Sequence, residues 1–314
     1  MSASTAADVA PDVAAAAARA NARARRRREI SRGVRRGLRT VLLIAFLIWI
    51  LAPFYFLLLV SFQSKADSLA TPPNWFPVPD PGNYARILSR AFSDAPISGP
   101  PDLILPGIRN SAIVATLTGL LNVVLGSLAG YAFARLRFPG SRRVPSALLA
   151  SQMVPAFALL IPYYVVLRQL GLTNNLIGVV VAELSITLPF TIWLLRAYFQ
   201  GIPLALERAA RIDGCDRLQT FLRVVLPLAR PGLIAVGLFA FMVAWNDFLF
   251  AIVLNSQTDA MLIQPAIAGL YNVREQSFGI MAAGSLLAAL PTMLLVLFLQ
   301  RFLVRGILSG ATKG

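Results

Sequence analysis

The chain has 314 residues, of which 57% are hydrophobic and only 14% are charged, and its formal net charge is +15. Soluble domains usually carry about 25% charged residues, so this composition excludes an ordinary soluble protein and is typical of a membrane protein. The sequence has no histidine and one cysteine, which excludes a histidine base, a disulfide within the chain and a thiolate metal cluster.

The first region, residues 1–37, is an arm rich in alanine and arginine that we expect to be cytoplasmic and disordered, with a loose helix as the alternative over residues 1–22. Its run of four arginines, Arg25 to Arg28, together with the net charge, could suggest a nucleic-acid partner. Beside long apolar segments we favour the other interpretation, in which the arm fixes the membrane topology and lies near anionic headgroups. We therefore predict membrane lipid, and no nucleic acid, as its surroundings.

Six apolar stretches follow the arm, each about 20 residues long, which is the length needed to cross a hydrocarbon core of about 30 Å. Because lipid cannot hydrogen-bond to the backbone, we expect each stretch to be a helix. Residues 38–314 are thus predicted to form one all-α, polytopic transmembrane domain. The predicted spans are residues 41–62, 111–134, 145–167, 176–195, 232–254 and 280–300.

Basic residues are distributed unequally between the segments that connect these spans. Of the 29 lysines and arginines, 23 lie in the arm, in the connections after the second and fourth spans, and in the C-terminal tail, which all share one side. The positive-inside rule predicts that this side is cytoplasmic. We therefore expect a multi-pass protein of the bacterial cell (inner) membrane with both termini in the cytoplasm.

The predicted fourth and fifth spans each contain a carboxylate. Glu183 and Asp247 both lie seven residues from the outer end of their span, or about 10 Å at 1.5 Å per residue. Charge at that depth is costly and commonly faces a polar cavity. The structural alternative is hydrogen bonding between helices, or pairing with Arg109 or Arg168. The residues that we predict to line a substrate path are Glu183, Trp245, Asn246 and Asp247.

The longest polar run after the arm lies between the predicted fourth and fifth spans, at residues 206–214. A helix-forming run, then Gly214, then Leu226-Pro227 predicts a short pair of helices outside the bilayer. The alternative is an amphipathic helix lying on the headgroups. The two lysines, Lys65 and Lys313, do not follow a glycine-rich phosphate-binding loop, so any nucleotide that drives this protein would be bound by another subunit.

The spacing within this polar segment resembles the Glu-Ala-Ala motif of ABC importer permeases. That motif consists of Glu-Ala-Ala, three residues, Gly, nine residues, Ile, one residue and Leu-Pro. The residues at matching positions are Ala209, Ala210, Gly214, Leu226 and Pro227, with Val224 in place of the isoleucine. The chain departs from the motif at one position, because Arg208 occupies the place of the glutamate and the acid, Glu207, lies one residue earlier.

Over about residues 38 to 314 the chain is similar to the smaller, six-span permease subunit of carbohydrate importers of the maltose and glycerol-phosphate type. Further segments that carry this resemblance are Asn110-Ser111, Tyr131-Ala132-Phe133-Ala134-Arg135 and Trp245-Asn246-Asp247-Phe248. The resemblance implies a type I ABC importer permease fold. The helix around Glu207 to Asp216 would then be the coupling helix, seated in a cleft of an ATPase.

The resemblance also implies partners. These would be a second permease subunit, a dimer of ATP-binding subunits that hold ATP and Mg²⁺, and an extracytoplasmic solute-binding protein. The chain itself would hold no cofactor or metal and would catalyse no reaction. The residues implied in coupling to the ATPase are Glu207, Arg208, Ala209, Ala210, Asp213, Gly214, Leu226 and Pro227.

Two other classes of function stay open on the sequence. A secondary carrier would use Glu183 and Asp247 for ions or protons and would work without an ATPase. A membrane-embedded enzyme is less favoured, because no histidine, metal cluster or nucleophile arrangement accompanies the two acids.

Overall fold

The computed structural model describes residues 9–72, 74–89, 100–256, 258–271 and 278–311. Every regular element within these residues is a helix, which confirms the all-α prediction. The chain divides into two compact units, of which one ends at Leu57 and the other begins at Leu58. Each is described by itself.

The first unit is carried by α1, Val9–Ser61, one continuous helix whose apolar part spans Arg35–Ser61. From Val9 onward the arm is part of this helix, which agrees with the loose-helix alternative for residues 1–22 and differs from disorder over the rest of the arm, while residues 1–8 lie outside the described residues. The physical reason is that alanine and arginine are strong helix formers. Once the apolar span has nucleated a helix, such residues extend it at little cost.

The second unit contains the remaining α-helices. They are α2 (Lys65–Ser68), α3 (Gly82–Ser89), α4 (Ile104–Arg135), α5 (Val144–Ser151), α6 (Ala156–Gln169), α7 (Leu176–Gln200), α8 (Leu204–Ile212), α9 (Arg217–Thr220), α10 (Leu226–Leu228), α11 (Arg230–Trp245), α12 (Leu249–Leu254), α13 (Ile263–Gly269) and α14 (Phe278–Ala311). Two short 3₁₀ turns, η2 (Pro100–Leu103) and η4 (Thr258–Ala260), and one π-helical turn, η3 (Phe221–Val225), complete it.

Four helices of the described residues are long and apolar enough to cross a membrane, and the number rises to six if each of two bent helix pairs counts as one span. The first pair, α5 and α6, covers the predicted third span but bends by 97°. Pro155 stands at this bend, as the N-cap of α6, where its missing N–H is tolerated. The predicted third span is therefore not one continuous helix.

The predicted fifth span is also interrupted. Within residues 232–254, α11 stops at Trp245 before α12 starts at Leu249. The second bent pair, Arg217–Leu228 and Arg230–Trp245, bends by 78° just before the predicted start of this span. The other spans are longer than predicted, since α4 begins at Ile104 and α7 continues to Gln200. Polar residues at 246–247 break the helix because their side chains bind the backbone groups that a continuous helix would use.

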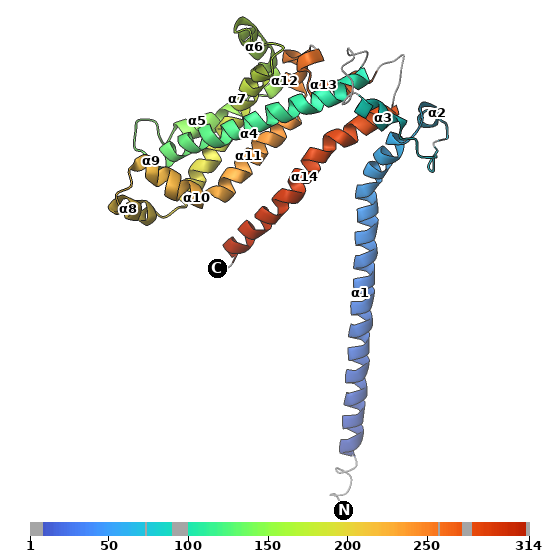
Figure 1. Cartoon of the computed structure of the whole chain (residues 1–314). Coiled ribbons are helices and arrows are strands. Elements are labelled where there is room, and N and C mark those ends of the chain that lie inside the picture. The colour runs from blue at the N-terminus through green and yellow to red at the C-terminus, as the bar shows by residue number, and fades with distance from the viewer. Residues whose placement is uncertain (1–8, 73, 90–99, 257, 272–277, 312–314) are drawn as a thin grey trace, which may run out of the picture. The chain divides into compact units, whose positions relative to one another are not determined.

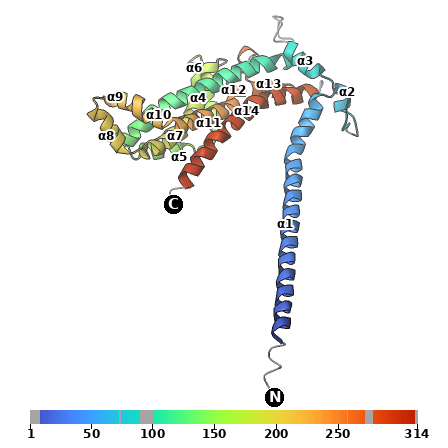
Figure 2. The same cartoon turned by 60° about the horizontal axis from the view of Figure 1, so that its bottom comes forward.

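The centre of the second unit is a bundle of α4, α7 and α11, which lie side by side in both views (Figures 1 and 2). Gly126 and Gly130 allow the close approach of α4 to α7, because an added Cβ would lie 2.4 Å from Thr191 Cγ2 and 3.0 Å from Leu195 Cβ. The small-xxx-small pair thus serves packing within this chain. Buried Asn122 adds hydrogen bonds with α7, donating to Thr187 Oγ1 at 2.7 Å.

The two ends of this bundle differ in what they carry. At one end lie α6, α12 and α13, and at the other lie α8, α9 and α10 (Figures 1 and 2). Each end has its own apolar core. The core near α8 consists of Leu195, Phe199, Ile202, Phe221, Val225, Ala229 and Val236. The α8 segment therefore stands on a packed base formed by α7, η3 and α11.

Candidate functional site: the α8 segment and the buried acids

The α8 segment begins and ends sharply. Pro203 precedes α8, and Gly214 follows it with a φ of +91°, a left-handed conformation that glycine adopts without strain. The turn is closed by the Cys215 N–H, which donates to the Ala210 carbonyl oxygen at 2.9 Å. The predicted coupling helix, placed around Glu207 to Asp216, thus starts earlier and ends at Ile212.

The chain leaves this turn through a second capped helix. Asp216 accepts a hydrogen bond from the Gln219 N–H at 2.7 Å, and the Gln219 side chain accepts one in return from the Asp216 N–H. This reciprocal pair is a capping box, and it starts α9. Beyond η3, Leu226 packs against the core near α8, and Pro227 occupies the first turn of α10. Leu226 and Pro227 therefore support the base of the segment.

Glu207 anchors α8 to the end of α4. Its side chain is buried, with the residue only 4% exposed. The Arg135 Nε donates to Glu207 Oε1 at 2.5 Å, and the Tyr131 hydroxyl donates to Oε2 at 3.0 Å. Arg135 also donates through Nη2 to the Ile202 carbonyl oxygen at 2.6 Å. Both carboxylate oxygens are thus bound within this chain.

Tyr131 is itself fixed by packing. Its ring contacts those of Phe199 in α7 and Phe221 in η3, with centroids 5.9 Å and 4.7 Å away. Tyr131 and Arg135 belong to a segment that carries the family resemblance, which implies no role for either residue. They occur four residues apart, so they share a face of α4, but their partner is more than 70 residues distant in the chain, and nothing in the local sequence identifies it.

The opposite face of α8 is exposed and basic. Arg208, Ala209, Arg211 and Asp213 are exposed, whereas Ala210 is buried beside Glu207. Ile212 is 86% exposed, the largest exposed fraction among the apolar residues of α8. An aliphatic side chain flanked by arginines is suited to insertion into a partner's pocket. Ile212 is not among the residues predicted from the sequence, although its position one turn after Arg208 predicts a shared face.

The second predicted site lies at the other end of the bundle and is formed differently. Glu183 on α7 is 2% exposed, and its Oε2 has no hydrogen-bond partner among the described residues. Asp247 lies in the break between α11 and α12, and α12 packs against α7. Glu183 and Asp247 lie close enough to interact electrostatically, so the fold brings together the two acids that the sequence placed at matching depth.

Trp245, Asn246 and Asp247 are adjacent in the chain but make different contacts. Asp247 caps α12, accepting hydrogen bonds from the N–H groups of Phe250 at 3.3 Å and Ala251 at 2.8 Å. Asn246 is exposed and donates to the Met242 carbonyl oxygen. Trp245 is buried, stacks on Phe241 and donates to the Ala288 carbonyl oxygen at 3.1 Å. The position of Trp245 is that of a packing residue, whereas the side chain of Asn246 is exposed.

The structure also tests whether Glu183 pairs with Arg109 or Arg168. Within the described residues the ion pair of Arg135 with Glu207 is the one that forms, so neither Arg109 nor Arg168 neutralises Glu183. Arg109 lies 3.5 Å from the Asn110 side-chain oxygen instead. Nearby, the Tyr163 hydroxyl donates to Ser185 on the same helix as Glu183. This region is therefore polar and only partly paired.

Comparison with known proteins agrees with this architecture. Residues 122–309 match the family described as "Binding-protein-dependent transport system inner membrane component". The trehalose transport system permease protein SugB of Mycobacterium tuberculosis is 38% identical over 215 residues, covering 68% of this chain and 78% of that protein. The trehalose/maltose transport system permease protein MalG of Thermococcus litoralis is 32% identical over 266 residues, covering 84% and 92%.

Solved structures give the same fold at lower identity. A chain of a bacterial ABC transporter involved in the import of the acidic polysaccharide alginate has a TM-score of 0.60 at 16% identity, covering 85% of this chain and 95% of that one. This likeness confirms the predicted type I importer permease fold. The chain is thus a multi-pass membrane protein that belongs to the family of binding-protein-dependent transport system inner membrane components.

Proposed function

We propose that this chain is a permease subunit of an ATP-driven carbohydrate importer, in which it forms half of the translocation path. The observation that supports the coupling part of this proposal is the α8 segment. One face of α8 is exposed and basic, and its buried face is bound to α4 through Glu207. The names of the relatives, which include trehalose and maltose permeases, support carbohydrate as the class of solute.

The contacts of α8 suggest how motion passes through the subunit. A displacement of α8 pulls on Arg135 and Tyr131, which belong to α4, and α4 is packed along α7 and α11. Because packed helices move as rigid bodies, an ATPase that shifts α8 would rotate these spans together. Glu207 in this scheme is a positioning residue, and the exposed Arg208, Arg211 and Ile212 meet the ATPase.

The partners follow from this arrangement. Arg208 and Arg211 suit a cleft that carries carboxylates, so the separate ATP-binding subunit, which would hold ATP and Mg²⁺, is expected to present acidic residues there. A second permease subunit would supply the other half of the path, and an extracytoplasmic solute-binding protein would deliver the solute. At the other end of the bundle, Glu183 and Asn246 are the residues most suited to contact solute hydroxyls.

The coupling role is tested by Gly214→Pro in the complete transporter. Proline fixes φ near −65°, which is incompatible with the observed +91°, so the exit from α8 changes while its anchor remains. We expect assembly with the ATPase to persist and solute-stimulated ATPase activity to be lost. Gly201→Ala is the matched control, because Gly201 ends α7 with an ordinary φ of −71°. Wild-type stimulation in Gly214→Pro would refute the coupling role.

The orientation is tested through the single cysteine. Cys215 directly follows Gly214 and is partly exposed. A maleimide that cannot cross membranes should label Cys215 in inverted membrane vesicles and leave it unlabelled in spheroplasts. The reverse pattern would place the α8 segment and both termini outside.

A second function, an ion- or proton-coupled carrier, is favoured by one observation, the unpartnered Oε2 of buried Glu183. Such a carrier would move solute after reconstitution of this chain alone, driven by an ion gradient. The importer requires its ATP-binding subunits, so solute uptake by the isolated chain distinguishes the two.

A further inference from the structure

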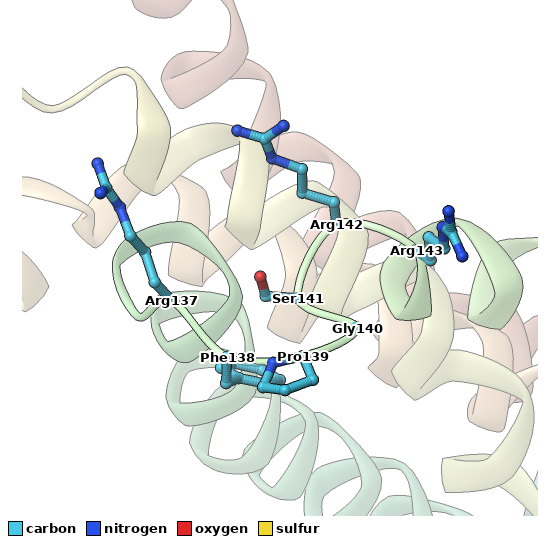
Figure 3. Close-up of a pocket in the computed structure, with 7 residues that line it drawn as sticks. All are labelled: Arg137, Phe138, Pro139, Gly140, Ser141, Arg142 and Arg143. Carbon is cyan, nitrogen blue, oxygen red and sulfur yellow. The ribbon is translucent and has the colours of Figure 1, made fainter.

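A second arginine cluster lies in the connection between α4 and α5 and has no part in the coupling scheme. Residues 137–143 curl around a hollow of about 580 Å³ (Figure 3). This loop lies at the same end of the bundle as α8 and α9 (Figure 1). Arg137, Arg142 and Arg143 are all exposed, so the loop presents three cations within seven residues.

No acid neutralises these three arginines within the described part of the chain. The sequence contains no aspartate or glutamate between Asp102 and Glu183. The ion pair that does form nearby binds Arg135 to Glu207 and leaves the three loop arginines outside it. The hollow is therefore a concentrated site of positive charge, open to an anionic ligand.

The backbone holds the arginines in a defined arrangement. Gly140, with a φ of +88°, lets the loop reverse, and its carbonyl oxygen accepts hydrogen bonds from the Arg143 and Val144 N–H groups, both at 2.9 Å. In Figure 3 the Ser141 hydroxyl lies at the centre of the loop, and the Arg137 and Arg142 side chains extend on the same side as that hydroxyl. Two guanidinium forks and a hydroxyl on one side match the oxygens of a phosphate group.

The apolar neighbours of the loop indicate where such a phosphate would come from. Leu136, Phe138 and Val144 are exposed large apolar residues that alternate with the arginines, and Phe138 contacts Phe133 at the end of α4 with ring centroids 5.5 Å apart. Exposed aliphatic and aromatic side chains next to arginines are typical of the boundary between headgroups and acyl chains. An aqueous face that binds a soluble anion has no need of them.

We propose that residues 137–143 bind the phosphate of an anionic phospholipid headgroup in the leaflet on the α8 side of the membrane. Arg137 and Arg142 contact the phosphate with their guanidinium groups, Ser141 donates a hydrogen bond from its hydroxyl, and Phe138 lies against the acyl chains. Basic pockets beside transmembrane helices on the cytoplasmic side recognise lipid headgroups by the same chemistry. A lipid held here lies next to Arg135, and so next to the anchor of α8.

The test counts lipids bound to the full-length chain in an uncharged detergent by native mass spectrometry, with phosphatidylglycerol as the probe and phosphatidylcholine as the zwitterionic comparison. The test variant is Arg137→Gln/Arg142→Gln/Arg143→Gln. The matched control is Arg208→Gln/Arg211→Gln/Arg217→Gln, which removes three exposed arginines from the α8 segment. Each arginine near an anionic lipid contributes about fivefold in affinity, so we expect about a hundredfold weaker binding of the tightest phosphatidylglycerol in the test variant alone.

A variant that keeps the positive charge shows whether binding depends on the geometry of the guanidinium groups or on charge alone. Lysine keeps the charge and loses the planar fork, so replacing the same three arginines with lysine should weaken binding by about tenfold. Equal binding in the lysine variant and the wild type, or equal weakening in the test and control variants, would overturn the proposal. Unchanged thermal unfolding and unchanged labelling of Cys215 establish that the variants keep their fold and topology.

The source of the anion is distinguished in the same experiment. Millimolar inorganic phosphate should leave phosphatidylglycerol bound, because a soluble anion gains nothing from Phe138. Displacement by phosphate would identify a free anion as the ligand and would overturn the lipid assignment. Full retention of phosphatidylglycerol by the glutamine variant, with loss of its association with the ATP-binding subunit, would also overturn it and would make the loop a docking surface.

Discussion

Two buried glutamates lie at opposite ends of the same bundle, and their surroundings differ sharply. Glu207 is 4% exposed and binds Arg135 and Tyr131 through both carboxylate oxygens. Glu183 is 2% exposed, and its Oε2 has no partner among the described residues. Burial is thus the same in both cases, and the hydrogen bonds distinguish the anchor, Glu207, from Glu183, whose Oε2 lacks a donor.

The difference has an energetic meaning. A buried carboxylate with charged and neutral donors is held in one geometry, and removal of either side leaves an uncompensated charge. A buried carboxylate oxygen without a donor lowers stability and is tolerated where function requires it. Substitution of Glu207 should therefore lower both stability and transport, whereas substitution of Glu183 should lower transport without lowering stability.

The largest effect is expected for Glu207→Ala. This change leaves Arg135 buried without its carboxylate, which should lower the free energy of unfolding of the bundle by about 3 to 5 kcal/mol. Solute-stimulated ATPase activity of the complete transporter should be lost as well, since α8 is released from α4. Thermal unfolding of the purified chain and ATPase assays measure the two effects.

A double-mutant cycle shows whether the pair acts as a unit. Arg135→Ala combined with Glu207→Ala should cost less than the sum of the single changes, with a coupling of about 1 to 3 kcal/mol. Strict additivity would mean that the ion pair contributes nothing, and the contrast with Glu183 would then disappear.

The next effect is expected for Tyr131→Phe, which removes one donor from Glu207 and keeps the aromatic packing against Phe199 and Phe221. A hydrogen bond to a charged group contributes about 1.5 to 3 kcal/mol, so stability should fall by about 2 kcal/mol. Phe199→Leu serves as the control that alters the packing alone. The Tyr131→Phe change should lower the stability of the wild type and should cause no further loss when it is added to Glu207→Gln. That result would show that the effect comes from the hydrogen bond.

How far the sequence predicted these sites depends on the range of the interactions. The α8 segment was predictable because its helix, its glycine and its Leu-Pro pair are local features, and Gly214 indeed has a positive φ. The anchor was not, since Tyr131 and Arg135 meet Glu207 only after α4 and α7 have packed. Charge counting treated Arg135 as one more cytoplasmic cation, although its side chain is bound in the interior.

The spans show the same limit. Hydropathy alone identified six apolar stretches, but it does not distinguish a straight helix from a bent one of equal composition. The bend at Pro155 and the break at Asn246-Asp247 depend on backbone hydrogen bonds that apolar averages ignore. For the arm, the composition left disorder and a loose helix as alternatives over residues 1–22, and the helix propensity of alanine and arginine explains why α1 extends back to Val9.

A smaller effect, with opposite sign, is expected for Glu183→Gln. The substitution keeps the shape of the side chain and removes a buried ionisable group whose Oε2 lacks a hydrogen-bond partner, so the free energy of unfolding should rise by about 1 kcal/mol. Solute uptake by the complete transporter should fall, because an amide replaces an ionisable acceptor in the path. A decrease in stability would show that Glu183 is an anchor like Glu207, and the comparison between the two would fail.

The smallest effect is expected for Asp247→Asn. This variant distinguishes a structural role of Asp247, as a helix cap, from a role in the solute path. As a cap, Asp247 accepts hydrogen bonds from Phe250 and Ala251, and asparagine caps helices nearly as well as aspartate. Asp247→Ala should therefore cost about 1 kcal/mol, and Asp247→Asn only a few tenths. Equal solute uptake in the asparagine variant and the wild type would make Asp247 structural, whereas loss of uptake at unchanged stability would place it beside Glu183 in the path.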